Sequence, residues 1–147
     1  MNRPVLSIKR LSDLATLPAY QSTEAAGMDL HAAIEQAIVL EPGAITLVPL
    51  GFAMALPPGF EGQVRPRSGL ASRHGITLPN APGTIDSDYR GEVKVPLVNL
   101  GDSAFTIEQG MRIAQMIIAP VVQAQLQEVD DLDDSDRGEG GFGSTGQ

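Results

Sequence analysis

The sequence predicts an all-β fold: a jelly-roll-like β-sandwich or barrel with one short helix and a flexible, glycine-rich C-terminal tail. Three observations lead to this fold class. The apolar segments are short, and turn signals recur about every eight to twelve residues. Valine, isoleucine and threonine are common in these segments, while the 16 glycines and 11 prolines are spread along the chain. This pattern is typical of an antiparallel sandwich and differs from the strand–helix alternation of a βαβ protein.

The first half of the chain supplies the first predicted strands. They cover residues 5–11, 28–32, 37–40, 44–49, 51–56 and 61–65. Proline and glycine stand together at residues 41–43 and again at 57–59, where they predict turns. We therefore expect antiparallel strands joined by short connections.

The second half begins with the one plausible helix, at about residues 68–73, which His74 and Gly75 close. Further strands are predicted over residues 76–78, 93–99, 104–107 and 112–122. Aromatic residues make up only 4% of the chain, so the core is expected to be aliphatic. The last strand is apolar on both faces and would leave apolar surface exposed in a monomer, which favours an oligomer.

The segment of residues 80–99 contains the main predicted structural and functional feature of the chain. Its second half alternates, with Val93, Val95, Leu97 and Asn99 on one face, as in a half-buried strand. Residues 76–78 are its predicted partner, so the two form a wide hairpin. The tip of that hairpin carries five chemically active side chains within seven residues: Asp86, Asp88, Tyr89, Arg90 and Glu92. A turn alone does not require them.

Length and composition set limits on the function. The chain has 147 residues, enough for one domain with one core. It has no cysteine, which excludes disulfides and thiol catalysis. We expect a cytoplasmic protein that does not bind membranes, because neither a signal-peptide pattern nor a bilayer-length apolar run is present. The formal net charge of −8 argues against nucleic-acid binding.

The composition changes after residue 129. Seven of the eighteen acidic residues lie between Glu128 and Glu139, and a glycine-rich ending follows. Such an acidic segment cannot pack and should be solvated. We therefore predict two parts: a jelly-roll core over residues 1–129, and an acidic linker with a mobile lid over residues 130–147. The alternative for this ending is a disordered tail, although Arg137, Phe142, Ser144 and Thr145 exceed what flexibility needs.

The segment of residues 83–92 (GTIDSDYRGE) resembles the third of five motifs of the trimeric, all-β dUTPase family, the dUTP nucleotidohydrolases. The other four are present in the family order at residues 26–30 (AGMDL), 66–71 (PRSGLA), 112–115 (RIAQ) and 137–146 (RGEGGFGSTG). The resemblance implies hydrolysis of dUTP to dUMP and pyrophosphate, which keeps uracil out of DNA and supplies dUMP for dTTP synthesis. It also implies a homotrimer in which three chains share each active site.

By this resemblance the hairpin carries the base, the sugar site and the uracil site. Asp86 is the general base that holds the water attacking the α-phosphate; otherwise it is an ordinary turn residue. Tyr89 supports the deoxyribose and leaves no space for a 2′-hydroxyl. The amide of Asn80 suits the mixed donor and acceptor edge of uracil. Backbone groups of the same hairpin are the main readers of the base: Gly83, Thr84 and Ile85.

The phosphate site is expected at the start of the short helix. Arg67 supplies charge, Ser68 donates to a bridging oxygen, and Gly69 permits close approach; a helix N-terminus also favours an anion. An N-cap serine on a structural turn is the alternative for Ser68. Gln115 matches the phosphate-contacting amide of the family. In the tail, the resemblance assigns Phe142 to stacking on uracil and Arg137, Ser144 and Thr145 to the γ-phosphate. Gly143 is expected to bind substrate as part of the glycine-rich segment, whose N–H groups can surround phosphate oxygens.

The expected cofactor is Mg²⁺, carried by the triphosphate and its water molecules without direct protein ligands. The resemblance places Asp29 beside it, acting on the water shell of the metal and on arginine positioning. His31 and His74 receive no role. Two other functions stay open at this point: a deaminase similar to dCTP deaminase, and a non-catalytic nucleotide-binding protein on the same fold.

Overall fold

The computed structural model describes residues 3–146 and contains ten strands and one short helix in that range. In chain order they are β1 (Ser7–Arg10), β2 (Met28–His31), β3 (Ile38–Leu40), β4 (Ile45–Ala55), β5 (Phe60–Pro66), α1 (Ser68–His74), β6 (Ile76–Thr77), β7 (Gly83–Ile85), β8 (Glu92–Asn99), β9 (Phe105–Ile107) and β10 (Arg112–Pro120). The predicted all-β class with one short helix is confirmed.

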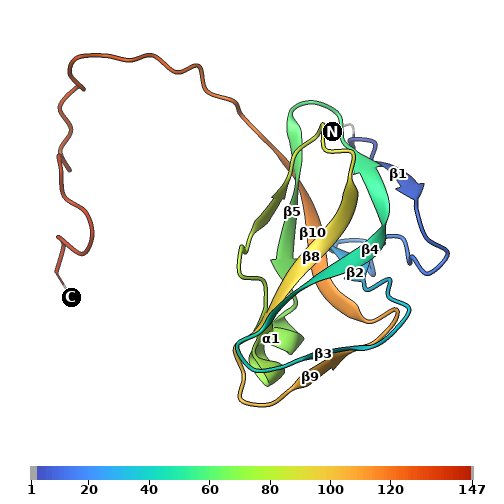
Figure 1. Cartoon of the computed structure of the whole chain (residues 1–147). Coiled ribbons are helices and arrows are strands. Elements are labelled where there is room, and N and C mark those ends of the chain that lie inside the picture. Colours follow the sequence, from blue (N-terminus) through green and yellow to red (C-terminus); the bar gives the residue numbers. More distant parts are fainter. Residues whose placement is uncertain (1–2, 147) are drawn as a thin grey trace.

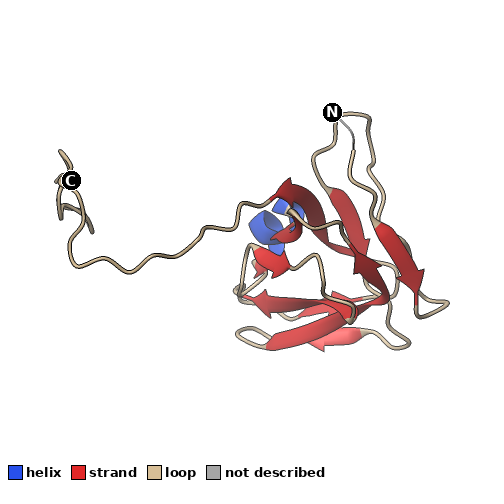
Figure 2. Ribbon diagram, turned by 90° about the horizontal axis from the view of Figure 1, so that it is seen from above, coloured by secondary structure: helices blue, strands red, loops and turns tan. Residues whose placement is uncertain are grey.

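Two four-stranded sheets form the body, in the orders β1-β4-β8-β6 and β2-β10-β5-β7, and β3 and β9 make a small third sheet. Every pairing in the three sheets is antiparallel. Figure 1 shows the long strands β4, β8, β5 and β10 wrapping around one core, with α1 at one end beside β3 and β9. In the view from above the strands enclose this core on several sides (Figure 2).

The core between the sheets is aliphatic, as the low aromatic content predicts. Phe52 is the one aromatic side chain among the largest fully buried residues of the described chain, and it belongs to the same buried cluster as Leu30, Leu50 and Met116. Asn99 is also fully buried. Its amide donates to the carbonyls of Leu40 and Ser103 at 2.9 and 2.8 Å, and its Oδ1 accepts from the Gly101 N–H at 2.9 Å. The amide therefore joins β8 to the β3–β9 corner.

Residues 44–49 and 51–56, predicted as successive strands, form one strand, β4. Its pairing with β8 is interrupted between Pro49 and Ala53. Gly51 lies in this interruption with a φ of 74°, a conformation that glycine adopts without strain. The Gly51 carbonyl accepts the N–H groups of Leu11 and Ser12. The interruption in β4 thus binds the segment that follows β1 through these two hydrogen bonds.

The predicted hairpin is only partly correct. β6 does pair with β8, with Ile76 opposite Asn99 and Thr77 opposite Val98. The segment between them, however, contains the short strand β7, which crosses to the other sheet and pairs with β5. β7 directly follows the turn residues Asn80, Pro82 and Gly83, and its strand geometry depends on pairing with β5, so the local pattern did not reveal this strand. The crossing connects the two sheets next to Asp86.

Several ends differ by a few residues from the prediction. β1 is shorter than residues 5–11, and α1 extends one residue further, to His74, before Gly75 ends it with a φ of 69°. β10 ends at Pro120 rather than residue 122, and the chain then leaves the body (Figure 1). The division at residue 129 stays a prediction; residues 1, 2 and 147, at the ends of the two predicted parts, lie outside the described residues.

Candidate functional site

The loop after β7 presents Asp86 and Tyr89. The Tyr89 N–H donates to the Asp86 carbonyl at 3.1 Å, which closes a tight turn, and the Arg90 guanidinium donates to the Ser87 carbonyl at 2.7 Å. The Tyr89 hydroxyl donates to the Glu92 carbonyl at 3.0 Å. The side chains of Asp86 and Tyr89 are exposed to solvent. The loop is thus held by its own hydrogen bonds and leaves the carboxylate accessible.

Asp86 and Tyr89 line a pocket of about 310 Å³. Its wall consists of Leu47, Thr84, Ile85, Asp86, Tyr89, Glu92, Val93 and Lys94. Asn80 lies nearby, because a Cβ built on Gly83 would stand 3.3 Å from its Nδ2. Apolar walls with a few polar groups are typical of small-molecule sites. Three of the residues predicted to bind uracil and the sugar, Thr84, Ile85 and Tyr89, therefore line the same pocket as Asp86, the predicted general base.

The start of α1 carries the second group. Arg67 is the N-cap residue, with extended φ and ψ of −88° and 131°, and Ser68 is the first helical residue. The alternative of Ser68 as an N-cap serine is therefore wrong. Gly69 has open space around it: a Cβ there would meet no atom within 4 Å. Ser68 is exposed, and the first N–H groups of a helix have no partner within the helix, so an anion is favoured at this end.

Arg67 turns back toward β10. Its guanidinium donates to the Arg112 carbonyl at 2.8 Å. The Arg112 guanidinium in turn lies 3.5 Å from Oδ2 of Asp29 on β2. Gln115 stands opposite Asp29 in the β2–β10 register, and its Nε2 donates to the Pro66 carbonyl at 3.0 Å. Two cations and one anion in this cluster leave a net positive charge, which suits a phosphate group.

His31 borders the same cluster, opposite Arg112 in the β2–β10 pair. Burial lowers its pKa; Asp29 acts in the opposite direction, and Arg112 and Arg67 lower the pKa further. Its Nδ1 is buried and has no hydrogen-bond partner in the described structure. The lowered pKa favours the neutral form of the His31 ring.

The two groups lie far apart in one chain. Ile85 pairs with Gly62, so Asp86 is level with about Glu61 on β5. Arg67 stands six residues beyond Glu61, which corresponds to roughly 20 Å of strand at about 3.3 Å per residue. A single chain therefore does not bring the predicted base to the predicted phosphate residues.

The tail is separate from both groups. After the Val121 N–H donates to the Gly59 carbonyl, the described tail makes hydrogen bonds only within itself, such as Ser144 N–H to Gly141 carbonyl at 3.0 Å. The Arg137 guanidinium donates to the Gly140 carbonyl at 2.6 Å, and the ring of Phe142 is fully exposed. Figures 1 and 2 both show the tail running away from the body. Its predicted site residues therefore face no other predicted site residue of this chain.

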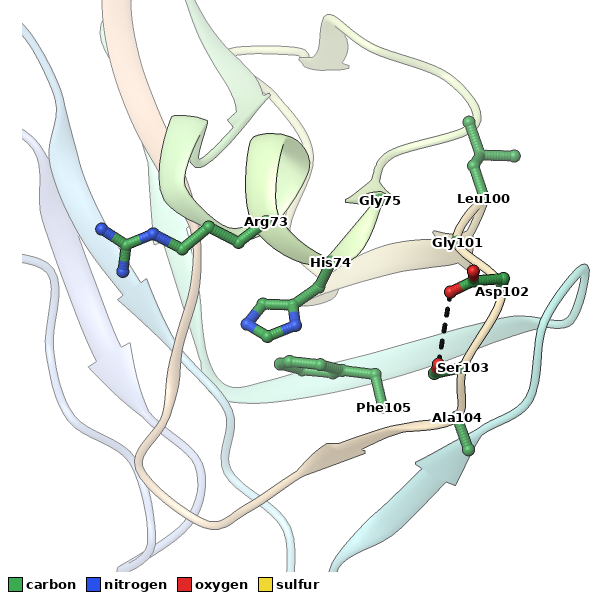
Figure 3. Close-up of a pocket in the computed structure, with 9 residues that line it drawn as sticks. All are labelled: Arg73, His74, Gly75, Leu100, Gly101, Asp102, Ser103, Ala104 and Phe105. Atoms are coloured by element: carbon green, nitrogen blue, oxygen red, sulfur yellow. Dashed lines mark hydrogen bonds between the residues drawn. The ribbon is translucent and has the colours of Figure 1, made fainter.

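Another hollow, of about 480 Å³, lies between the end of α1 and the loop before β9 (Figure 3). The His74 ring packs on the Phe105 ring, with 5.0 Å between centroids and 51° between planes. Asp102 accepts a hydrogen bond from the Ser103 hydroxyl at 3.2 Å. None of the predicted site residues line this hollow, and the contact with Phe105 gives His74 a packing role.

A family model described as dUTPase matches residues 13–146 of the chain. The chain belongs to the dUTPase family. It is 61% identical over 148 residues to the deoxyuridine 5′-triphosphate nucleotidohydrolase of Rhizobium leguminosarum bv. trifolii (strain WSM2304), with 98% of this chain and 95% of that protein covered. It is 56% identical to the protein of the same name from Syntrophotalea carbinolica, with 99% of each covered.

Solved dUTPases share the fold. The dUTPase of Staphylococcus bacteriophage 80alpha, whose structure was determined with dUPNHPP, superposes with a TM-score of 0.89 at 28% identity. The superposition covers 97% of this chain and 99% of the phage chain. The dUTPase fold expected from the five motifs is confirmed.

Two residues next to the predicted phosphate site received no role from the sequence. Arg112 lies within the fourth motif, yet only the structure places its guanidinium beside Asp29 and its carbonyl beside Arg67. Gly27 lies within the first motif, and it faces the side chain of Gln115. Neither contact is visible in spacing, because each joins segments distant in the sequence.

Within residues 3–146, His, Cys, Asp and Glu side chains form no group of three or more that could hold a metal ion. In the same range, α1 is too short to span a bilayer and no longer apolar helix exists.

Proposed function

We propose that the chain hydrolyses dUTP to dUMP and pyrophosphate, by attack of water on the α-phosphate. One observation carries the proposal. The chain has two separate groups: a loop that presents the exposed Asp86 carboxylate beside a pocket, and a basic cluster around Arg67 at the start of α1. Membership of the dUTPase family and the similarity to enzymes of that activity support it.

Asp86 orients the attacking water molecule and accepts a proton from it. Its exposure in the loop leaves room for both water and substrate. Phosphoryl transfer needs a positioned nucleophile and neutralised charge more than covalent help, and a general base contributes about 10²–10⁴-fold. Arg67, Ser68 and Gln115 bind the phosphate oxygens, and Arg112 adds a second cation to the same cluster.

Mg²⁺ supplies charge neutralisation when it is bound to the triphosphate, since phosphate oxygens and water are its usual ligands. The Asp29 carboxylate fits the role of an acceptor for metal-bound water. Its contact with Arg112 is long, at 3.5 Å, and a carboxylate has room for several hydrogen bonds. Asp29 would thus accept hydrogen bonds from the water molecules of bound Mg²⁺ while it keeps its contact with the Arg112 guanidinium.

The uracil and the sugar occupy the pocket beside β7. Backbone groups of Gly83, Thr84 and Ile85 and the amide of Asn80 bind the uracil edge, and the Tyr89 ring packs against the deoxyribose. Phe142 of the tail stacks on uracil, and the other tail residues close on the γ-phosphate: Arg137, Gly143, Ser144 and Thr145. The tail acts as a lid.

The complete site is formed by a homotrimer. The roughly 20 Å between Asp86 and Arg67 and the outward course of the tail support contributions from three chains. Large apolar side chains on the outer face of β4 support association as well, since Ile45 and Leu47 are 63% and 56% exposed. A cytoplasmic location and the lack of nucleic-acid binding stay predictions from the sequence.

Release of pyrophosphate from dUTP, UTP and dCTP tests the function. We expect rapid release from dUTP and little from the other two. A deaminase would instead release ammonia from dCTP, and a non-catalytic binding protein would bind dUTP without turnover. Either of these results would overturn the proposal.

A further inference from the structure

We propose that Gly27 is a positioning residue for the side-chain amide of Gln115. A Cβ built on Gly27 would lie 2.7 Å from Oε1 of Gln115, 3.4 Å from its Cβ and 3.5 Å from its Cδ. Only the first of these distances is shorter than real contacts of a Cβ atom; the other two are ordinary van der Waals contacts, so the conflict is with Oε1, the end of the amide. The inference rests on the proposed function, because it concerns how Gln115 meets the phosphates.

Gly27 is required for space and not for backbone conformation. It is absent from the positive-φ glycines of the described chain, whereas Gly43, Gly51 and Gly75 are among them. An alanine could therefore adopt the backbone of Gly27 without strain. The one conflict it would create is with the amide of Gln115.

The contacts of this amide show what the missing side chain permits. Nε2 of Gln115 donates one N–H to the Pro66 carbonyl at 3.0 Å, while Oε1 lies against Gly27. A primary amide has two N–H donors, so the second stays available for a ligand. Because Pro66 directly precedes Arg67, that donor lies beside the basic cluster. The hydrogen bond to the Pro66 carbonyl and the space left beside Gly27 together set the orientation of the Gln115 amide.

A methyl group at residue 27 would push Oε1 away and rotate the amide out of this orientation. The bond to Pro66 and the direction of the free N–H would be lost together. We expect KM for dUTP in Gly27→Ala to rise about ten- to hundredfold, the effect of losing one hydrogen bond to a charged group. Since the phosphate contact exists before and during the reaction, kcat should change little.

A double-mutant cycle separates this role from a general structural one. The four proteins are the wild type, Gly27→Ala, Gln115→Ala and the double variant, each measured for KM, kcat and melting temperature. Without the amide there is nothing to displace, so Gly27→Ala should not raise KM further in the Gln115→Ala background. Ala26→Ser, an exposed change next to Gly27, controls for disturbance of the loop and should keep the KM of the wild type.

Two outcomes would overturn the role of Gly27 and leave the assignment of Gln115 intact. One is additive effects of the two substitutions on KM. The other is a normal KM in Gly27→Ala together with a raised KM in Gln115→Ala. An unchanged KM in Gln115→Ala would overturn the assignment of Gln115 as well. Should Gly27→Ala fail to fold, folding of the double variant would still identify the collision with the amide. Failure of both to fold would contradict it.

Discussion

The Tyr89 hydroxyl donates a hydrogen bond of 3.0 Å to the backbone carbonyl of Glu92. The bond holds the phenol ring across Gly91, where an added Cβ would stand 2.6 Å from Cζ of the ring. The loop itself therefore fixes the ring before any substrate arrives. A rigid ring at this place can exclude a single additional atom on the sugar.

This rigidity predicts sugar discrimination. We expect kcat/KM for UTP to be lower than for dUTP by about 10²-fold or more, because a fixed wall rejects the 2′-hydroxyl. Tyr89→Ala should reduce the ratio of kcat/KM for dUTP to kcat/KM for UTP. Tyr89→Phe keeps the ring but loses its hydrogen bond to Glu92, so its ratio should lie between those of the wild type and Tyr89→Ala. Equal rates with both nucleotides in the wild type would contradict the role of Tyr89.

Asp86→Asn tests the general base. The amide keeps the size of the carboxylate but cannot accept a proton from water, so kcat should fall by at least about 10²-fold. Substrate affinity should stay near that of the wild type, since removal of a negative charge near phosphates does not weaken their binding. Asp88→Asn, two residues along the same exposed loop, is the matched control and should retain most activity. Normal turnover in Asp86→Asn would remove this residue from the mechanism.

Asn99→Ala tests the buried amide that joins β8 to the β3–β9 corner. It leaves the carbonyls of Leu40 and Ser103 and the N–H of Gly101 without their partners. We expect a loss of about 3 kcal/mol in the free energy of unfolding, and a melting temperature lower by roughly 6–12 °C. The exposed Asn80 provides the comparison: Asn80→Ala should change the melting temperature little. Equal melting temperatures for the two variants would refute the structural role of Asn99.

The alternation of Val93, Val95 and Leu97 and the turn residues were sufficient to predict β8, most other strands and α1. Such signals are local, and burial in a sandwich enforces them. The three-residue strand β7 was missed because its position depends on pairing with β5, not on its own pattern. For the site, the motifs named the residues, yet the contacts of Arg112 with Asp29 and of Gly27 with Gln115 arise from chain segments that only folding brings together.

Deletion of residues 137–147 tests the lid. The described part of this segment makes hydrogen bonds only within the tail, so the melting temperature should hardly change. Most activity should be lost, because the contacts with the γ-phosphate and the stacking of Phe142 disappear. In the full chain, proteolysis within residues 130–140 should slow when dUPNHPP and Mg²⁺ are added. Equal protection with and without the nucleotide would contradict closure of a mobile lid.

Mixed trimers test whether three chains share each site. Two inactive variants are needed: Asp86→Asn, which keeps its tail, and a chain that ends at Asp136, which keeps its base. If the base and the tail of one site come from different chains, a site works only where a truncated chain supplies Asp86 and an Asp86→Asn chain supplies the tail. In a closed ring of three, every trimer that contains both variants has one such site.

Random assembly at equal amounts makes about three-quarters of the trimers mixed, so roughly a quarter of all sites should regain activity under cyclic symmetry. A chain with both defects, co-expressed with Asp86→Asn, is the control and should regain none, because no intact Asp86 is present. Base and tail supplied by the same chain would give no recovery in either mixture. Activity that stays at the level of the separate variants, in preparations where mixed trimers are demonstrated, would therefore refute the three-chain site, because it would place Asp86 and the tail of one site on the same chain.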